Sequence, residues 1–216
     1  MAPIYRLYTP PGSLFAFAPL VASEYSGVAV ETISTENMEE TIASKSPTGK
    51  APILETPKGD IVVSSQAIAS FLANLRRDSE LLGSGCSLRD KVAVEDWIHW
   101  AEQELELPAC ALYYMATGIM RTDEANYNFS KSKQDMESAL KVMEVQLEKE
   151  KSNYLVLAEQ ITLADIVIAC YLVYPFTLVF DEAKLNQFPN VSKWFMLCMQ
   201  QPEFVSVLGK IECGKQ

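Results

Sequence analysis

The sequence has little from which a metal or nucleic-acid site could be built. It contains one histidine, His99, and its five cysteines include no Cys-x-x-Cys pair, so no structural zinc site or other metal centre is expected. Basic residues are scarce: 18 lysines and arginines stand against 28 acidic residues, for a formal net charge of -10. Without a basic stripe to neutralise phosphates, direct nucleic-acid binding is not expected. The odd number of cysteines indicates a reducing compartment, and we predict a cytoplasmic protein.

The sequence also lacks an apolar run that could cross a membrane. Residues 166–180 form a run of 15 residues interrupted by Pro175, whereas a bilayer needs about 20 residues, so this segment is predicted to be core. The apolar stretch 14–22 can be interpreted as a secretory signal. A strand-like segment, 4–8, and the turn Pro10-Pro11-Gly12 precede it, which favours a buried helix instead.

The first third of the chain alternates strand and helix signals. Short β-branched or alternating segments predict strands, and apolar residues at helical spacing predict helices. Pro57-Lys58-Gly59-Asp60 signals a hairpin between two of the strands. The pattern predicts strands at 4–8, 28–33, 53–55 and 61–63, and helices at 14–25, at 36–43, and after Ser64 with apolar residues Ile68, Phe71, Leu72 and Leu75. The order is β-α-β-α-β-β-α, an α/β module.

The rest of the chain is predicted to be helical. Residues 78–88 are polar and lack apolar periodicity, so we place an interdomain linker there, between domains at 1–77 and 89–216. Beyond it, apolar residues repeat on one helix face in several segments, and we expect them to pack as core. The clearest of these segments are 94–105, 136–147 and 191–198. The fold class is therefore α/β plus all-α.

Two short motifs have the chemistry of a ligand site. Lys50-Ala51-Pro52 directly precedes a predicted strand. An X-Pro bond can be cis at a cost of only ~0.5–1 kcal/mol over the commoner trans form. A cis bond here would leave the N–H and C=O of the preceding residue free to pair with a peptide-like ligand. Ser64-Ser65-Gln66 opens a helix whose unpaired N–H groups suit a carboxylate, or the serines simply cap that helix.

A third motif has a structural role. Thr162 and Asp165 fit a capping box at the start of the apolar run, in which the Asp165 carboxylate reaches back to the Thr162 N–H. Because the helix is apolar almost all round, we expect this end of it to be buried.

In this order, three segments resemble motifs of the cytosolic glutathione transferases: the cis-proline loop Lys50-Ala51-Pro52, the γ-glutamyl site Ser65-Gln66-Ala67-Ile68, and the buried helix cap Thr162-Leu163-Ala164-Asp165-Ile166. The resemblance covers the whole chain. It implies a thioredoxin-like N-terminal domain with a mixed four-stranded sheet, and a C-terminal helical bundle domain. It also implies glutathione as ligand or co-substrate, with contacts from Lys50, Ala51, Pro52, Ser65 and Gln66.

A narrower resemblance lies in Leu7-Tyr8-Thr9, Glu24-Tyr25-Ser26-Gly27 and Gly118-Ile119-Met120, and above all in the tail, 188–195 with 201–204 and 207–209. These segments are similar to the N-terminal domain of the gamma subunit of translation elongation factor 1. The resemblance implies a scaffold that binds the nucleotide-exchange subunit, and a homodimer. Similar domains precede some aminoacyl-tRNA synthetases, so that alternative stays open. The full gamma subunit continues into a charged linker and a further domain, and we expect either a fragment or a stand-alone relative.

Whether the chain is an enzyme depends on the loop after the first strand. Members of the family donate a hydrogen bond to the glutathione sulfur from this loop, which favours the thiolate. The candidates here are Tyr8, Thr9 and Ser13, but the family's serine-x-proline-x-arginine pattern is absent. Ser13 has the best placement for a catalytic role, and it can equally act as a helix N-cap.

Ser64 stands where the family commonly has an acidic residue, so reduced glutathione affinity is expected. An active transferase that conjugates glutathione to electrophiles remains the alternative.

Overall fold

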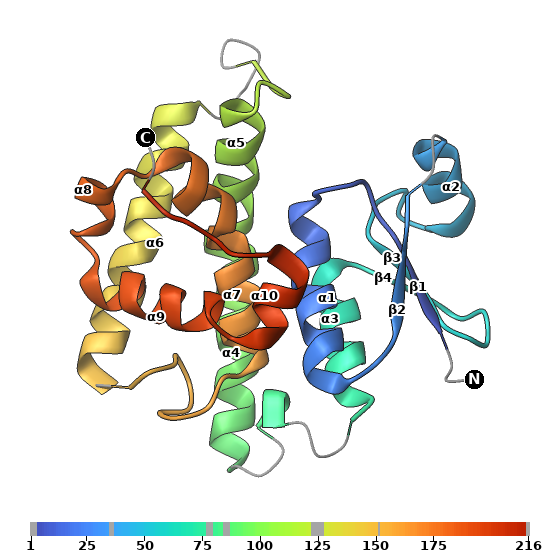
Figure 1. Ribbon diagram of the computed structural model, residues 1–216, viewed down its shortest axis with the longest axis horizontal. Helices are drawn as coiled ribbons and strands as arrows, with labels where there is room; N and C mark the ends of the chain where they lie inside the picture. The colour runs from blue at the N-terminus through green and yellow to red at the C-terminus, as the bar shows by residue number, and fades with distance from the viewer. Residues whose placement is uncertain are drawn as a thin grey trace. The chain divides into compact units, whose positions relative to one another are not determined.

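The computed structural model describes residues 4–34, 37–76, 80–83, 87–121, 128–150 and 152–214. The chain divides into two compact units, Met1–Gly85 and Cys86–Gln216, which are labelled by element in Figure 1. The predicted linker, 78–88, spans this division. Residues 78, 79 and 84–86 lie outside the described residues, so the domain limits stay a prediction.

The first unit has the predicted order of elements. In the part that the structure describes, the strands and the first two helices begin and end within two residues of their predicted limits, and the third helix begins directly after Ser64 as predicted. The 3-10 helix at 80–82 was not predicted and falls within the predicted linker. The elements are β1 (Tyr5–Tyr8), α1 (Leu14–Ser26), β2 (Val30–Ile33), α2 (Met38–Lys45), β3 (Ile53–Glu55), β4 (Ile61–Val63), α3 (Ser65–Asn74) and a short 3-10 helix η1 (Glu80–Leu82). Leu75, predicted on the apolar face of α3, follows its last residue and is 40% exposed, so this position was wrong.

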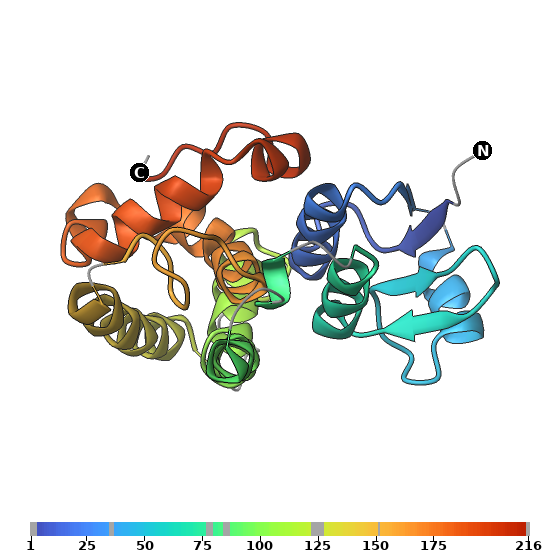
Figure 2. The same ribbon diagram turned by 90° about the horizontal axis from the view of Figure 1, so that it is seen from below.

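The strands form one mixed sheet in the order β2-β1-β3-β4, in which only β1 and β2 are parallel. Successive side chains of a strand point to opposite faces. Leu7 and Leu54 therefore face the core that α1 and α3 cover, whereas Tyr8 and Glu55 face α2. Figure 2 shows α1 and α3 on one side of the strands and α2 on the other. This is the thioredoxin-like arrangement that the family resemblance implies.

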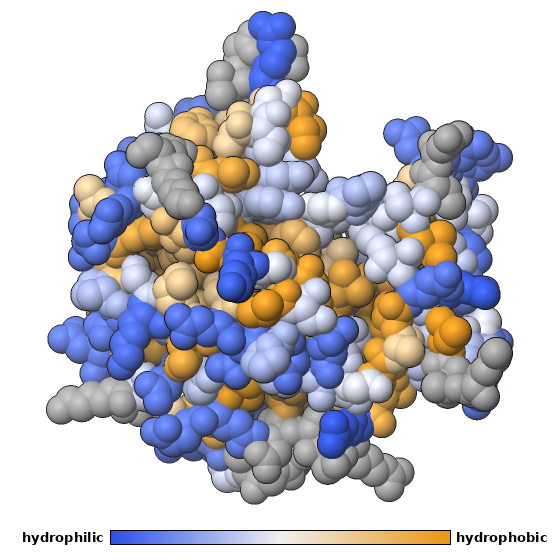
Figure 3. All heavy atoms as spheres, in the orientation of Figure 1, coloured by the Kyte–Doolittle hydropathy of each residue, from blue (hydrophilic) through white to orange (hydrophobic). Residues whose placement is uncertain are grey.

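Polar contacts rather than apolar burial attach α2 to the sheet. The helix has no buried residue, and Figure 3 shows hydrophilic side chains over it. The Lys45 ammonium lies 2.7 Å from Glu55 Oε2 and 4.8 Å above the Tyr8 ring, and the Tyr8 hydroxyl donates to the same Glu55 oxygen at 2.8 Å. The hydrogen bonds from Lys45 and Tyr8 hold the pKa of Glu55 below its ordinary value, and the bond to Glu55 raises the pKa of Lys45.

The second unit is helical around a buried central helix. Its elements are α4 (Leu88–Glu104), α5 (Glu106–Ala116), α6 (Phe129–Glu150), α7 (Leu163–Tyr174), the π-helix η2 (Pro175–Val179), α8 (Glu182–Leu185), α9 (Pro189–Met199) and α10 (Pro202–Leu208). Every residue of α7 except Tyr174 is buried, and α4, α5 and α9 pack against it. The prediction that residues 166–180 are core is confirmed for this helix, and Phe176 and Val179 extend the core into η2.

The helix predicted over 94–105 is interrupted at its end. Leu105 separates α4 from α5, and Pro108 lies in the first turn of α5. A proline has no N–H, so Pro108 cannot donate to the carbonyl of Glu104, and its ring crowds that carbonyl. Val94, Ala101 and Leu105 are buried as predicted, which keeps the apolar face continuous up to this break.

One carboxylate joins three segments of the helical unit. Asp165 is fully buried and accepts four hydrogen bonds of 2.8–2.9 Å: from the Leu155 N–H, from the N–H and hydroxyl of Thr162, and from the indole N–H of Trp194 in α9. The predicted capping box at Thr162 is confirmed. Burial raises the pKa of Asp165, and the four donors oppose that rise because they stabilise the ionised form.

Replacing Asp165 by alanine should destabilise the helical unit by about 3–5 kcal/mol, because buried N–H groups of three segments lose their acceptor. Urea unfolding of the full chain, followed by tryptophan fluorescence, measures the loss, since all three tryptophans lie in this unit. The matched control is Asp90→Ala. Asp90 forms the same capping box with Ser87 at an exposed helix start, where about 1 kcal/mol is expected. Equal losses in the two variants would contradict the role assigned to burial.

The contact of α2 with the sheet should depend on pH. Glu55 has a folded-state pKa below its ordinary value of 4.5, so its stabilisation is present above that pH and is lost as the pH falls through the lower folded value. Glu55→Gln should therefore cost about 0.5–1 kcal/mol near neutral pH and much less near pH 3. Urea unfolding of the full chain, followed by the NMR amide signals of β1 and β3, tests this. Glu24→Gln, an exposed control on α1, should show no such trend; a cost independent of pH for Glu55→Gln would disprove the charge effect.

Candidate functional site

The sequence-predicted site residues of the first unit meet at one edge of its sheet. Tyr8 of β1 lies opposite Ile53 of β3, and Ile53 lies opposite Val63 of β4. The next residues along this row are Thr9, Pro52 and Ser64, so the loop after β1, the loop before β3 and the start of α3 converge there. The N-terminus of α1, preceded by Ser13, follows the same loop after β1.

The Ala51-Pro52 peptide bond is cis, as the family resemblance requires. Pro52 is buried, Ala51 is half-buried and Lys50 is exposed. Within the described chain the N–H and C=O of Ala51 have no intramolecular hydrogen bond, whereas the Lys50 N–H donates to the Ser46 hydroxyl at 3.3 Å. Ala51 thus offers one donor and one acceptor at the sheet edge, the pair that an extended peptide-like ligand needs.

The serines at the start of α3 do not cap it, which corrects one of the two interpretations of Ser64-Ser65-Gln66. The Ser64 hydroxyl donates to Gln66 Oε1 at 3.3 Å, and the Ser65 hydroxyl donates to the Phe15 carbonyl of α1 at 2.7 Å. Ser64, the N-cap residue, therefore gives the start of α3 no side-chain cap. Ser64 also has a φ of 76°, a left-handed conformation that costs energy for a residue with a side chain and is concentrated at functional sites.

Of the three candidate hydroxyls at the end of β1 and in the loop after it, one has no competing partner among the described residues. The Tyr8 hydroxyl donates to Glu55 on the α2 face of the sheet. Thr9 is 2% exposed, and its hydroxyl lies 3.4 Å from the Pro10 carbonyl. Ser13 is half-buried, and its side chain makes no N-cap hydrogen bond, so the capping interpretation was wrong here too. Ser13 is the hydroxyl best able to donate to a ligand at this edge.

Cysteine chemistry is disfavoured in the described residues. Cys110, Cys170, Cys198 and Cys213 are free thiols, and Cys86 lies outside the described residues. Burial raises the pKa of Cys110 to about 12, and it raises the pKa of the other three as well. Because the thiolate is the reactive form, these four side chains are poor nucleophiles at neutral pH.

Other ligand types find no site in the part of the chain that the structure describes. There, no group of three or more His, Cys, Asp or Glu side chains is arranged to hold a metal ion. His99 is exposed and lies 3.3 Å from Glu102. None of the described helices is both long and apolar enough to span a bilayer.

Sequence reasoning missed the partner of Tyr8. Tyr8 was a candidate for thiol activation. Nothing in the sequence around it shows that its hydroxyl donates to Glu55 or that the Lys45 ammonium lies over its ring. One signal was available: Glu55 is an acidic residue in a strand that pairs with β1, on the same face as Tyr8. Pairing registers, which the sequence does not give, were needed to use it.

Comparison with known proteins agrees with this geometry. The family model of the glutathione S-transferase N-terminal domain matches residues 7–80, and that of the C-terminal domain matches residues 110–202. Elongation factor 1-gamma of Equus caballus and of Homo sapiens are each 31% identical to this chain over 219 residues, which cover 97% of this chain and 47% of theirs. The chain therefore spans about half the length of the curated relatives it matches.

Solved structures share the fold. Glutathione S-transferase-I bound with lactoylglutathione has a TM-score of 0.82 at 20% identity, covering 97% of this chain and all of that chain. A glutathione S-transferase from Methylobacillus flagellatus with glutathione bound has a TM-score of 0.74 at 22% identity, covering 94% of this chain and 98% of that one. With the predicted sheet and the cis-proline loop in place and both domain models matched, the chain belongs to the glutathione S-transferase family.

Proposed function

We propose that this chain is the glutathione-transferase-like domain of an elongation factor 1-gamma, a cytoplasmic scaffold that binds the nucleotide-exchange subunit of the elongation factor 1 complex. The observation that carries the proposal is the similarity to that subunit along 97% of the chain. The strongly acidic composition favours protein partners over direct nucleic-acid contact, and a homodimer is part of the proposal. The related N-terminal domain of an aminoacyl-tRNA synthetase is the competing parent protein.

We further propose that the sheet edge binds glutathione weakly. An extended tripeptide can pair with the free N–H and C=O of Ala51 beside Pro52. Its γ-glutamyl carboxylate would lie at the N-terminus of α3, near Ser65 and Gln66, where the Ser64 side chain forms no cap and the helix dipole favours a negative charge. The exposed Lys50 ammonium can attract a ligand carboxylate. Because Ser64 is not acidic, the ligand ammonium lacks a partner there, which weakens binding.

A second function, glutathione transfer to electrophiles, is favoured by the state of Ser13. Its hydroxyl has no intramolecular partner in the described residues, so it is free to donate to the glutathione sulfur. A donated hydrogen bond stabilises the thiolate, which is the nucleophile in conjugation. Ser13 would be the catalytic residue in that case.

Glutathione titration by calorimetry should detect binding, and Lys50→Ala should weaken it about five-fold, as expected for one exposed charge contact. Lys58→Ala is the matched control, since Lys58 is also exposed but lies in the β3–β4 turn. Equal affinities in the two variants, or no binding to the native chain, would contradict the proposed site.

A conjugation assay on the native chain and on Ser13→Ala separates the two functions. If the chain is a transferase, removing the Ser13 hydroxyl should lower the turnover rate about 100-fold. This is the loss expected when one hydrogen-bond donor to a developing anion is removed. A scaffold should show negligible turnover in both, together with stable capture of the purified exchange subunit in size-exclusion chromatography. Failure to capture that subunit would disprove the scaffold proposal whatever the conjugation result.

A further inference from the structure

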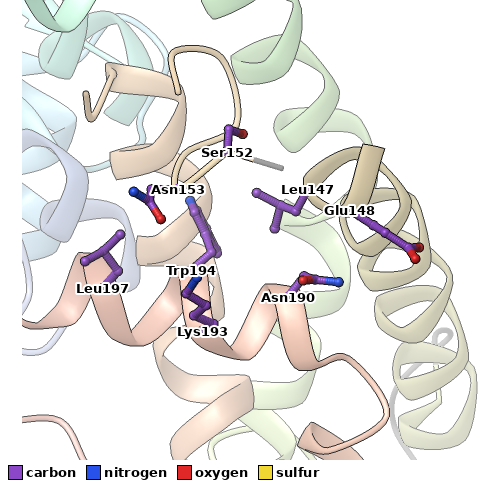
Figure 4. Close-up of a pocket in the computed structure, with 8 residues that line it drawn as sticks. All are labelled: Leu147, Glu148, Ser152, Asn153, Asn190, Lys193, Trp194 and Leu197. Atoms are coloured by element: carbon purple, nitrogen blue, oxygen red, sulfur yellow. The ribbon is translucent and has the colours of Figure 1, made fainter. Parts of the chain in front are cut away.

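A cavity of about 330 Å³ lies within the helical unit, and all the residues that line it belong to that unit. Figure 4 shows it between the last turns of α6, the start of the loop 152–162, and α9. Leu147, Trp194 and Leu197 supply its apolar lining. We call it the α6–α9 cavity. Its volume is within the range of small-molecule sites, which begin at about 300 Å³.

Polar contacts hold together the elements that form the α6–α9 cavity. Glu144 of α6 accepts hydrogen bonds from the Asn190 and Val191 N–H groups and from the Asn190 side chain, at 2.7–3.0 Å, and so ties α6 to the start of α9. Trp194 is held through its indole N–H by Asp165. The cavity is therefore formed before any ligand arrives, which lowers the cost of binding.

Two amide side chains present acceptors to this cavity. The Asn190 amide nitrogen is used by Glu144, and the Asn153 amide nitrogen donates to Glu159 at 3.3 Å. Because a carboxylate can only accept, Glu144 and Glu159 fix the orientation of the two side-chain amides. Their oxygens are left to accept hydrogen bonds from a ligand. In Figure 4 the Asn153 oxygen is turned toward Trp194 and its nitrogen away. The Ser152 hydroxyl donates to the Tyr154 carbonyl at 2.6 Å, so it too can only accept from a ligand.

Opposite charges line the same cavity without meeting. Glu148 comes from α6 and Lys193 from α9; both are exposed, and neither has an ion pair with a described residue. A ligand with a carboxylate and an ammonium would satisfy both. The carboxylate would pair with Lys193, and the ammonium with Glu148 and the two amide oxygens.

We propose that the α6–α9 cavity binds a free α-amino acid with an apolar side chain. Its two charged groups match the separated charges and acceptors of the lining, and its side chain would lie on Leu147 and Leu197. The site is independent of the proposed glutathione site, which lies in the other unit.

Calorimetric titration of the full chain with leucine tests the proposal, and two analogues identify the contacts. Leucinamide lacks the carboxylate and N-acetylleucine lacks the ammonium, so each should bind about five-fold more weakly than leucine. Lys193→Gln should weaken the binding of leucine by about the same factor and leave the affinity for leucinamide unchanged. Glu148→Gln should weaken the binding of leucine and leave the affinity for N-acetylleucine unchanged. Lys91→Gln, an exposed lysine on α4, is the matched control and should change nothing.

Three results would overturn the proposal: no leucine binding at millimolar concentration, equal affinity for leucine and both analogues, or equal effects of Lys193→Gln and Lys91→Gln. Saturating glutathione and the Lys50→Ala substitution should leave leucine binding intact. Loss of leucine binding under either condition would place the ligand at the sheet edge of the first unit instead, and would also overturn the assignment.

Discussion

The Asp165 carboxylate is the constraint on which the helical unit depends. Backbone N–H groups and an indole can only donate hydrogen bonds, and a carboxylate can only accept them. Donors from the loop 152–162, from the start of α7 and from α9 converge on it. An asparagine of the same shape would turn an NH₂ group toward a donor and leave a buried N–H unpaired, so only an ionised acid satisfies the whole set. Burial raises the pKa of Asp165, and those same four bonds oppose the rise.

Carboxylates have a comparable organising role elsewhere in the chain. Glu55 takes the Tyr8 hydroxyl and the Lys45 ammonium, which leaves Tyr8 unable to serve a ligand at the sheet edge. Glu144 takes the place of an N-cap side chain at α9, where Phe188 has none to offer. In both cases an acid from one element satisfies donors of another. At the sheet edge, the Ala51 N–H and C=O and the Ser13 hydroxyl have no hydrogen-bond partner among the described residues, so they are available to a ligand there.

The order of the elements could be predicted from the sequence because local signals decide it. Apolar periodicity and turn residues are short-range signals, and the capping box at Thr162 joins residues three apart.

The candidate site at the sheet edge was predictable only in part. Ser13 and Ser65 fit the N-cap pattern, yet the Ser65 hydroxyl donates to Phe15, 50 residues away, and the Ser13 side chain caps nothing. Such pairings are set by packing between α1 and α3, which no local pattern records. The break at Leu105 is different: Pro108 was visible in the sequence, and its effect on the Glu104 carbonyl follows from its chemistry.

The two candidate sites differ in how far they are preorganised before a ligand binds. At the sheet edge, α2 is attached by exposed or half-buried polar contacts, and the nearby Ser64 holds a costly backbone conformation. Glu144 and Asp165 hold together the elements that form the α6–α9 cavity, and their partners are backbone N–H groups, the side chains of Asn190 and Thr162, and the Trp194 indole. Ordering costs subtract directly from binding free energy. For the two proposed sites, we therefore expect a small ligand to meet a lower ordering cost in the cavity than a tripeptide meets at the sheet edge.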